Sequence, residues 1–210
     1  MNVLLAHGSS DGRHGEQVHQ LCEQVSRFLD GPVQAGFLSE KKLPQRARVL
    51  PLFLGGGEHM SRDVPMLIEA SGGEILPPLN ANLMAEMAFD LATHGKRKVD
   101  VLFAAYRFAD FEMLNAALYR LNKRCSKMAL ASMHSEPSVT SVLQYWSGQG
   151  VTNIQLQPML LFEGRTLSQL SARMRDQVSN MASMDVSVGD VLCKHDNFAS
   201  VVADVFKGSS

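Results

Sequence analysis

The pattern of apolar and polar positions in the first half of the chain alternates between two periods. Short apolar runs bounded by glycine or polar residues are typical of buried parallel strands, whereas apolar residues three and four apart indicate amphipathic helices. The pattern predicts strands at 3–6, 33–38, 48–54 and 74–77, and helices at about 14–29, 62–71 and 80–93. Strands that alternate with helices indicate an α/β unit built on a mostly parallel sheet.

The second half of the chain repeats this pattern. Residues 101–105 align with residues 3–7 at an offset of 98, and residues 158–161 align with residues 51–54 at an offset of 107. The larger second offset indicates an extra helix in the second half, because residues 39–47 of the first half are too few for a crossover helix. Strands are expected at 99–104, 127–132, 153–162 and 188–192, and helices at about 110–123 and 136–148, with a last helix ending near 206.

These repeats predict an α/β protein of two duplicated units, each a mostly parallel sheet flanked by helices. The polar residues 93–98 are interpreted as the linker between the units. The predicted boundaries are 1–94 for the N-terminal unit and 95–210 for a degenerate C-terminal repeat.

Composition narrows the function classes. The 210 residues are 45% hydrophobic and 20% charged with a formal net charge of −1, which argues against a nucleic-acid partner because such proteins normally carry a basic face. Three distant cysteines without a CxxC pair indicate buried free thiols in a reducing compartment. No signal peptide or membrane-spanning run is visible, so we expect a cytoplasmic protein without a membrane partner.

Two histidines follow apolar runs at places where chemistry is expected. His7 follows the first predicted strand, and His59 follows the run that ends in Gly55-Gly56-Gly57. In open α/β sheets, ligands bind where the chain leaves the carboxyl ends of the strands. Neighbouring strands would place both imidazoles on one rim, where a histidine pair suits a divalent transition metal and a proton-accepting step.

The residues beside the two histidines are candidates for substrate binding. Gly8 lets the chain turn without a side chain in the cleft, and the hydroxyls of Ser9 and Ser10 lie close to a predicted helix start, where anions bind. Glu58 is a second possible proton acceptor. Arg62 is either a fork donor for a substrate carboxylate or a solvated arginine.

The remaining polar candidates are mostly interpreted as structural or surface residues without a direct role in chemistry. Asp63 or Ser61 can serve as a helix N-cap, and for Asp63 this role is favoured over a direct chemical one. His14, His19 and His94 are expected to be structural or surface residues, and His195 is expected to cap the region of the last helix; the role of His134, just past a strand, is open. In the repeat alignment His7 matches Ala105 and His59 matches about Thr166, so the second unit keeps the apolar scaffold without either imidazole.

The two histidine segments also resemble a known family. Leu4-Leu5-Ala6-His7-Gly8-Ser9-Ser10-Asp11 and Pro51-Leu52-Phe53-Leu54-Gly55-Gly56-Gly57-Glu58-His59-Met60-Ser61-Arg62-Asp63-Val64-Pro65 are similar to signatures of the class II tetrapyrrole chelatases. The most similar members are the sirohydrochlorin cobalto- and ferrochelatases of cobalamin and sirohaem synthesis. Many members carry an acidic residue directly after a Phe-Leu pair; here that position is Ser39, with Glu40 one step later, so the role of Glu40 is open.

The resemblance implies a metal chelatase that holds its tetrapyrrole in a cleft between the two units. It assigns metal binding and acceptance of the pyrrole protons to His7 and His59. Imidazole, with a reference pKa of about 6.5, suits both tasks. The substrates implied are the tetrapyrrole and a divalent ion, Co2+, Fe2+ or Ni2+, with no organic cofactor; generic affinity orders do not select the ion. Monomer and homodimer both stay open.

Two other functions compete with the chelatase interpretation. A protein of this fold can bind a metal ion or a tetrapyrrole as a carrier, without inserting one into the other. A strand that ends in His-Gly is also similar to the histidine phosphatases. Those enzymes place an arginine directly before the histidine, where this chain has Ala6.

Overall fold

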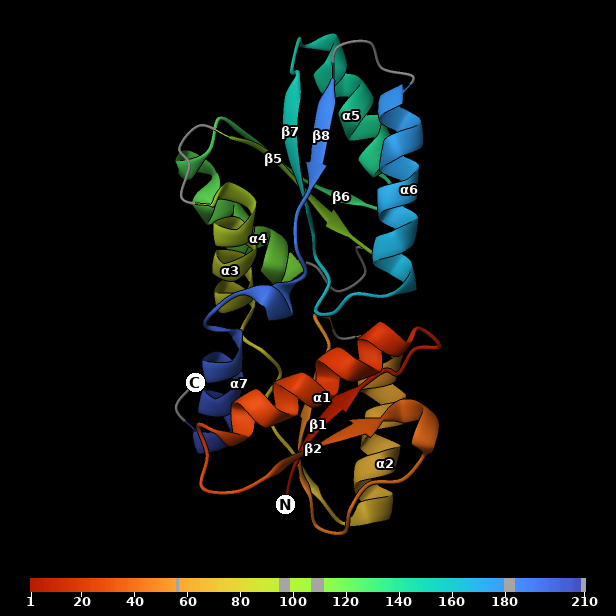
Figure 1. The fold of residues 1–210 in the computed structure, drawn as a ribbon, viewed down its shortest axis with the longest axis vertical. Helices are drawn as coiled ribbons and strands as arrows, with labels where there is room; N and C mark the ends of the chain where they lie inside the picture. Colours follow the sequence, from red (N-terminus) through yellow and green to blue (C-terminus); the bar gives the residue numbers. More distant parts are fainter. Residues whose placement is uncertain (56, 95–98, 107–111, 180–183, 209–210) are drawn as a thin grey trace. The chain divides into compact units, whose positions relative to one another are not determined.

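The computed structural model describes residues 1–55, 57–94, 99–106, 112–179 and 184–208 (Figure 1). The chain forms two compact units. The first comprises Met1–Asn80, Leu161–Gly164 and Cys193–Ser210, and the second comprises Ala81–Leu160 and Arg165–Leu192. Each unit is built on one four-stranded parallel sheet, so the predicted class of two duplicated α/β units is confirmed.

The first unit carries the sheet β2-β1-β3-β4, in which all neighbours are parallel. Its strands are β1 (Asn2–Ala6), β2 (Val33–Phe37), β3 (Arg48–Pro51) and β4 (Glu74–Ile75). Its helices are α1 (Gly12–Ser26), α2 (Val64–Ser71) and α7 (Phe198–Lys207), with a short 3-10 turn η1 (Leu38–Glu40) and a π-helical turn η2 (His59–Asp63). Only η1 connects β2 to β3, which agrees with the helix expected to be missing from this half.

The second unit repeats this order as β6-β5-β7-β8, again all parallel. Its strands are β5 (Asp100–Ala105), β6 (Lys127–Ser132), β7 (Asn153–Pro158) and β8 (Asp185–Val188). Its helices are α3 (Ala81–Thr93), α4 (Glu112–Leu121), α5 (Val139–Gly148) and α6 (Arg165–Ser179), with the 3-10 turns η3 (Asn122–Arg124) and η4 (Leu192–Lys194). Figure 1 shows α3 and α4 on one side of this sheet and α5 and α6 on the other.

Each sheet is apolar on both faces because helices cover both. Val3 and Leu5 of β1 pack with Val64 in the cluster on the α2 side. Successive side chains of a strand point to opposite faces, so the fully buried Leu4 and the nearly buried Ala6 lie on the other face, which α1 and α7 cover. This two-sided burial explains why the strands appear as continuous apolar runs.

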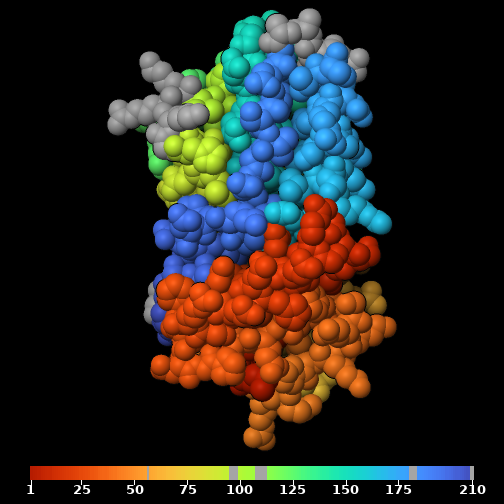
Figure 2. Space-filling model, in the orientation of Figure 1, coloured from red at the N-terminus to blue at the C-terminus, as the bar shows by residue number. Residues whose placement is uncertain are grey.

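The helices that follow β4 and β8 pack with the opposite halves of the sequence. Helix α3 packs on α4 and β7, and α7 packs on α1 and β3. Figure 2 shows the blue C-terminal segment directly beside the orange-red α1. The observed division therefore differs from the predicted boundary after residue 94, because apolar helix faces do not reveal which sheet they cover; residues 95–98 of the predicted linker lie outside the described residues.

Two features of the second unit differ from the expectation. Helix α6 was not predicted, since its sequence is mostly polar and only Leu170 and Met174 are buried. The alignment of residues 101–105 with residues 3–7, at an offset of 98, is wrong by one residue. The N–H of Leu52 bonds to Leu5 O and the N–H of Met159 bonds to Ala104 O, both at 2.8 Å.

The hydrogen-bond register therefore gives an offset of 99, so that Tyr106, and not Ala105, matches His7. An apolar run carries no internal mark of register, which explains the displacement. In the part of the chain that the structure describes, no helix combines the length and apolar character needed to cross a membrane.

We expect Leu4→Ala to destabilise the first unit by about 2–5 kcal/mol, because it leaves a cavity at a site with no solvent exposure. Urea denaturation measures the change in the free energy of unfolding. Leu83→Ala is the control, since Leu83 is 40% exposed. Equal losses in the two variants would contradict the described core.

Candidate active site

The structure brings His7 and His59 together. His7 directly follows β1, and His59 opens η2 after the neighbouring parallel strand β3. Their Nε2 atoms are 2.9 Å apart, and their ring centroids are 4.4 Å apart with the planes at 74°. Both residues belong to the first unit. The site therefore contains two imidazole nitrogens that face each other at the carboxyl edge of one sheet.

A π-helical turn positions His59. The N–H of Val64 bonds to His59 O, five residues back, and the turn continues directly into α2. Asp63 lies four residues after His59, and its Oδ2 is 2.6 Å from His59 Nδ1. Such wide turns are rare and often mark functional sites.

The expectation that Asp63 caps the helix is wrong. Asp63 itself has helical backbone angles, and its side chain makes no capping hydrogen bond. Because the π-helical turn continues into α2, no separate helix start exists at Asp63, and its carboxylate contacts His59 instead. The sequence contains a signal for this contact, since a histidine and an aspartate four residues apart share one helical face.

The neighbouring groups define the tautomers of the pair. A carboxylate only accepts hydrogen bonds, so Nδ1–H of His59 donates to Asp63. His7 Nδ1 is 2.9 Å from Gly8 O, and a carbonyl also only accepts, so Nδ1–H of His7 donates to that oxygen. Both Nε2 atoms then carry lone pairs that face each other at 2.9 Å. This arrangement favours a metal cation between them.

The separation of the two nitrogens suits a metal ligand pair. An ion at about 2.0–2.1 Å from both atoms has a nitrogen–metal–nitrogen angle of about 90°, as in octahedral coordination. Among the described residues, no cluster of three or more histidine, cysteine, aspartate or glutamate side chains is arranged to hold a metal ion. The pair thus supplies two ligands and leaves the other coordination positions to water or substrate, which suits an ion in transit.

The loop after His7 is tightly built. Gly8 has a φ of +87°, and a Cβ at this position would lie 3.1 Å from Ser39 Oγ. Ser9 Oγ accepts the N–H of Asp11, and Asp11 in turn accepts the N–H of Arg13 to cap α1. The Ser9 hydroxyl therefore already has a role in the loop.

The other predicted substrate-binding residues are open to solvent. The side chains of Ser10, Glu58 and Arg62 are exposed, with Glu58 and Arg62 on either side of His59 in sequence. Phe53 adds an apolar wall, since its ring centroid is 6.3 Å from that of His59. Glu40 is exposed at the end of η1.

His14 is a neighbour of the site. The sequence indicates only a structural or surface residue at this position. Its ring lies against Phe37 and Phe162, with centroids 6.4 and 5.2 Å away. Burial, with the nearby His7 as a second cause, lowers the pKa of His14, and within the described residues its buried Nδ1 has no hydrogen-bond partner. Phe162 comes from the segment Leu161–Gly164, which Gln17 holds by accepting the N–H of Glu163. No sequence signal connects that segment to the first unit.

His134 and His195 are far from the pair in sequence and have other partners. His134 belongs to the second unit, where its ring meets the edge of Tyr106 at a centroid distance of 4.5 Å. His195 Nδ1 accepts the N–H of Asn197, the residue at the N-cap position of α7, so His195 orders the turn before the helix and does not itself cap it.

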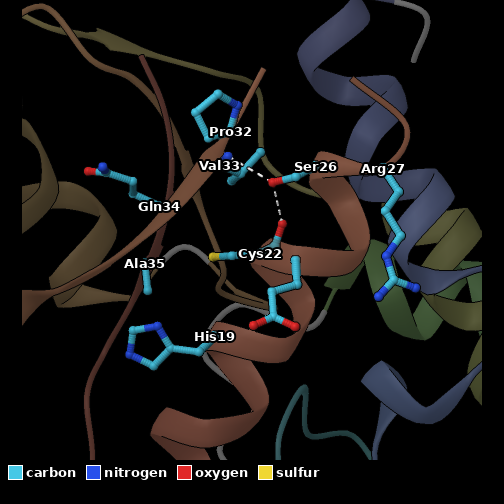
Figure 3. Close-up of a pocket in the computed structure, with 9 residues that line it drawn as sticks. His19, Cys22, Ser26, Arg27, Pro32, Val33, Gln34 and Ala35 are labelled. Atoms are coloured by element: carbon cyan, nitrogen blue, oxygen red, sulfur yellow. Dashed lines mark hydrogen bonds between the residues drawn. The ribbon is translucent and has the colours of Figure 1, made fainter. Parts of the chain in front are cut away.

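A separate hollow lies between α1 and β2 (Figure 3). It has a volume of about 690 Å³ and is lined by His19, Cys22, Glu23, Ser26, Arg27, Pro32, Val33, Gln34 and Ala35. Ser26 donates to Cys22 O and accepts the N–H of Val33, which joins helix to strand. Burial raises the pKa of Cys22 to about 12. The lining includes none of the predicted site residues.

The fold and the site together define the class. A duplicated parallel α/β fold with a histidine pair on a strand edge is the arrangement implied by the resemblance to class II chelatases. The chain belongs to the CbiX family, whose model matches residues 1–122 and, separately, residues 91–208. The two overlapping matches agree with the duplication. They also confirm the family membership that the two histidine segments indicate.

Solved structures show the same fold. SirB from Bacillus subtilis with Fe3+ has a TM-score of 0.76 at 14% identity over 99% of this chain and 94% of that chain. SirB from Bacillus subtilis subspecies spizizenii in complex with cobalt has a TM-score of 0.72 at 14% identity, over 99% and 94%. CbiX, described as the terminal enzyme for siroheme biosynthesis in denitrifying bacteria, has a TM-score of 0.67 at 14% identity, over 100% and 99%. No curated protein sequence matches this chain.

The pKa of His14 predicts a pH dependence of stability. Because burial lowers this pKa, the unfolded chain takes up a proton as the pH falls through about 6.5, whereas folded His14 takes up its proton only at a lower pH. The free energy of unfolding therefore decreases as the pH falls below about 6.5. We expect His14→Phe to reduce this decrease, as measured by urea denaturation at about pH 7.5 and about pH 5.5. An equal decrease in both proteins would exclude His14 as its source.

Proposed function

We propose that the protein inserts Co2+ or Fe2+ into sirohydrochlorin or a related tetrapyrrole, with His7 and His59 binding the metal and accepting the pyrrole protons. The observation that carries the proposal is the 2.9 Å approach of the two Nε2 atoms. Membership of the CbiX family and the iron and cobalt in the two SirB structures support this metal substrate. Ni2+ is a third candidate ion, because imidazole suits it equally.

The proposed reaction exchanges one metal ion for two protons. The ion binds to both Nε2 atoms and loses part of its water. As the macrocycle nitrogens coordinate the ion, the two pyrrole N–H groups lose their protons and the two imidazoles are released. Each imidazole then has a free Nε2 lone pair that can accept one of these protons, so charge and atoms balance.

The exposed residues around the pair would hold the tetrapyrrole. We assign Arg62 to a carboxylate substituent of the macrocycle, because an exposed guanidinium binds carboxylates in a fork. Gly8 lets the loop after His7 lie close to Ser39, where a side chain would not fit, and the loop of Ser9 and Ser10 supplies further polar groups. Glu58 lies next to His59 as an additional proton acceptor.

A carrier that binds metal or tetrapyrrole without insertion is the second candidate. The lone-pair arrangement at the pair favours cation binding as such, and the second unit has Tyr106 where the first has His7. Binding of both cobalt and sirohydrochlorin without a change in the tetrapyrrole absorbance would identify a carrier.

We expect His7→Ala and His59→Ala each to lower the rate of Co2+-dependent change in sirohydrochlorin absorbance by roughly 100-fold or more, since each removes a ligand and a proton acceptor. His19→Gln, an exposed histidine of α1, is the control and should keep the native rate. A native rate in His7→Ala would remove His7 from catalysis.

For Arg62→Ala we expect the KM for sirohydrochlorin to rise roughly tenfold or more, because a hydrogen bond between charged groups is lost. The KM for the metal ion should stay unchanged, and Arg62→Lys should restore part of the tetrapyrrole affinity. Steady-state kinetics with each substrate varied in turn separate the two constants. An unchanged KM for sirohydrochlorin would show that Arg62 is solvated.

A further inference from the structure

The two imidazoles of the pair have unequal partners. His59 Nδ1 is 2.6 Å from the carboxylate of Asp63, whereas His7 Nδ1 is 2.9 Å from the backbone carbonyl of Gly8. Hydrogen bonds to a charged acceptor are roughly twice as strong as those between neutral groups. His59 is therefore held more firmly, and its ring is the better electron donor to a metal.

The two imidazoles also differ in the backbone that carries them. His59 and Asp63 are the first and last residues of one π-helical turn, which continues into α2. His7 is exposed and lies in an irregular loop before α1, and its partner is the very next residue, Gly8, whose φ is +87°. The helical segment holds the His59–Asp63 geometry, while His7 depends on a loop.

We propose that Asp63 is a positioning residue that makes His59 the imidazole that retains the metal ion and leaves His7 as the imidazole that releases the ion first. This inference rests on the proposed function of the pair. Transfer of the ion to a macrocycle requires the two bonds between metal and imidazole to break in some order, and the weaker ligand leaves first. The carboxylate behind His59 determines that order.

A purely structural role for Asp63 does not fit its contacts. Its side chain makes no capping bond to α2 and is 44% exposed, so its removal leaves neither an uncapped helix nor a cavity. The hydrogen bond to His59 Nδ1 is the interaction that its carboxylate makes at the site.

The first test removes the carboxylate. We expect Asp63→Ala to raise the Kd for Co2+ alone by roughly 10–100-fold, as loss of such outer partners does at other metal sites. Titration of the cobalt absorption bands measures this Kd. The 15N chemical shifts of labelled histidines should show His59 losing its Nδ1–H tautomer in the variant, a change that a structural role would not cause.

Two further variants control this test. Glu69→Ala removes an exposed carboxylate from α2, the helix that follows Asp63, and should leave the Kd and the tautomer of His59 native. Asp63→Asn keeps a neutral acceptor for the Nδ1–H of His59 and should give an intermediate Kd with a native tautomer. If Asp63→Ala does not fold by circular dichroism, the Kd of Asp63→Asn decides the test. A native Kd in the deciding variant would overturn the proposal.

The second test compares the two ligands. We expect His59→Ala to weaken Co2+ binding at least roughly tenfold more than His7→Ala does, and equal or reversed losses would overturn the proposed order. The measurement uses the metal alone, so its outcome is separate from chelatase activity. If the variants show this order but the native protein with Co2+ leaves sirohydrochlorin unchanged, the chelatase proposal is refuted and this one is retained.

Discussion

The parallel pairing of β1 with β3 is the constraint on which the site depends. Parallel neighbours end at the same edge of a sheet, so the chain that leaves β1 through His7 meets the chain that reaches His59 after β3. The two residues are 52 positions apart in sequence, yet their Nε2 atoms lie 2.9 Å apart. The apolar cores on both faces of the sheet hold these strand ends in place, and the loops only complete the approach.

Much of this arrangement could be predicted from the sequence. The apolar runs identify the strands because they are buried on both faces, and the two histidines stand out because each follows such a run. The duplication is also visible, since Pro51 and Pro158 occupy the same register position in the two sheets.

The rest depends on interactions that the pattern does not encode. The mostly polar α6 packs through few side chains, so its periodicity is weak. The π-helical turn places Asp63 inside a continuous helical segment and not at a helix start, and Phe162 reaches His14 from a segment far along the chain. Tertiary packing likewise determines which of the two sheets α3 and α7 each cover.

The exchange of α3 and α7 has a consequence for how the two repeats depend on each other. A fragment cut after residue 94 would retain all four strands of the first sheet but would lack α7. The sheet face that bears Leu4 would then be partly exposed to water, because one of its two covering helices is missing. The same fragment would contain α3 without α4 and β7, on which it packs. The buried side chains of Met84, Met87 and Phe89 would therefore be exposed to water. Each repeat thus depends on a helix that the other half of the sequence supplies, so neither is a self-sufficient folding module.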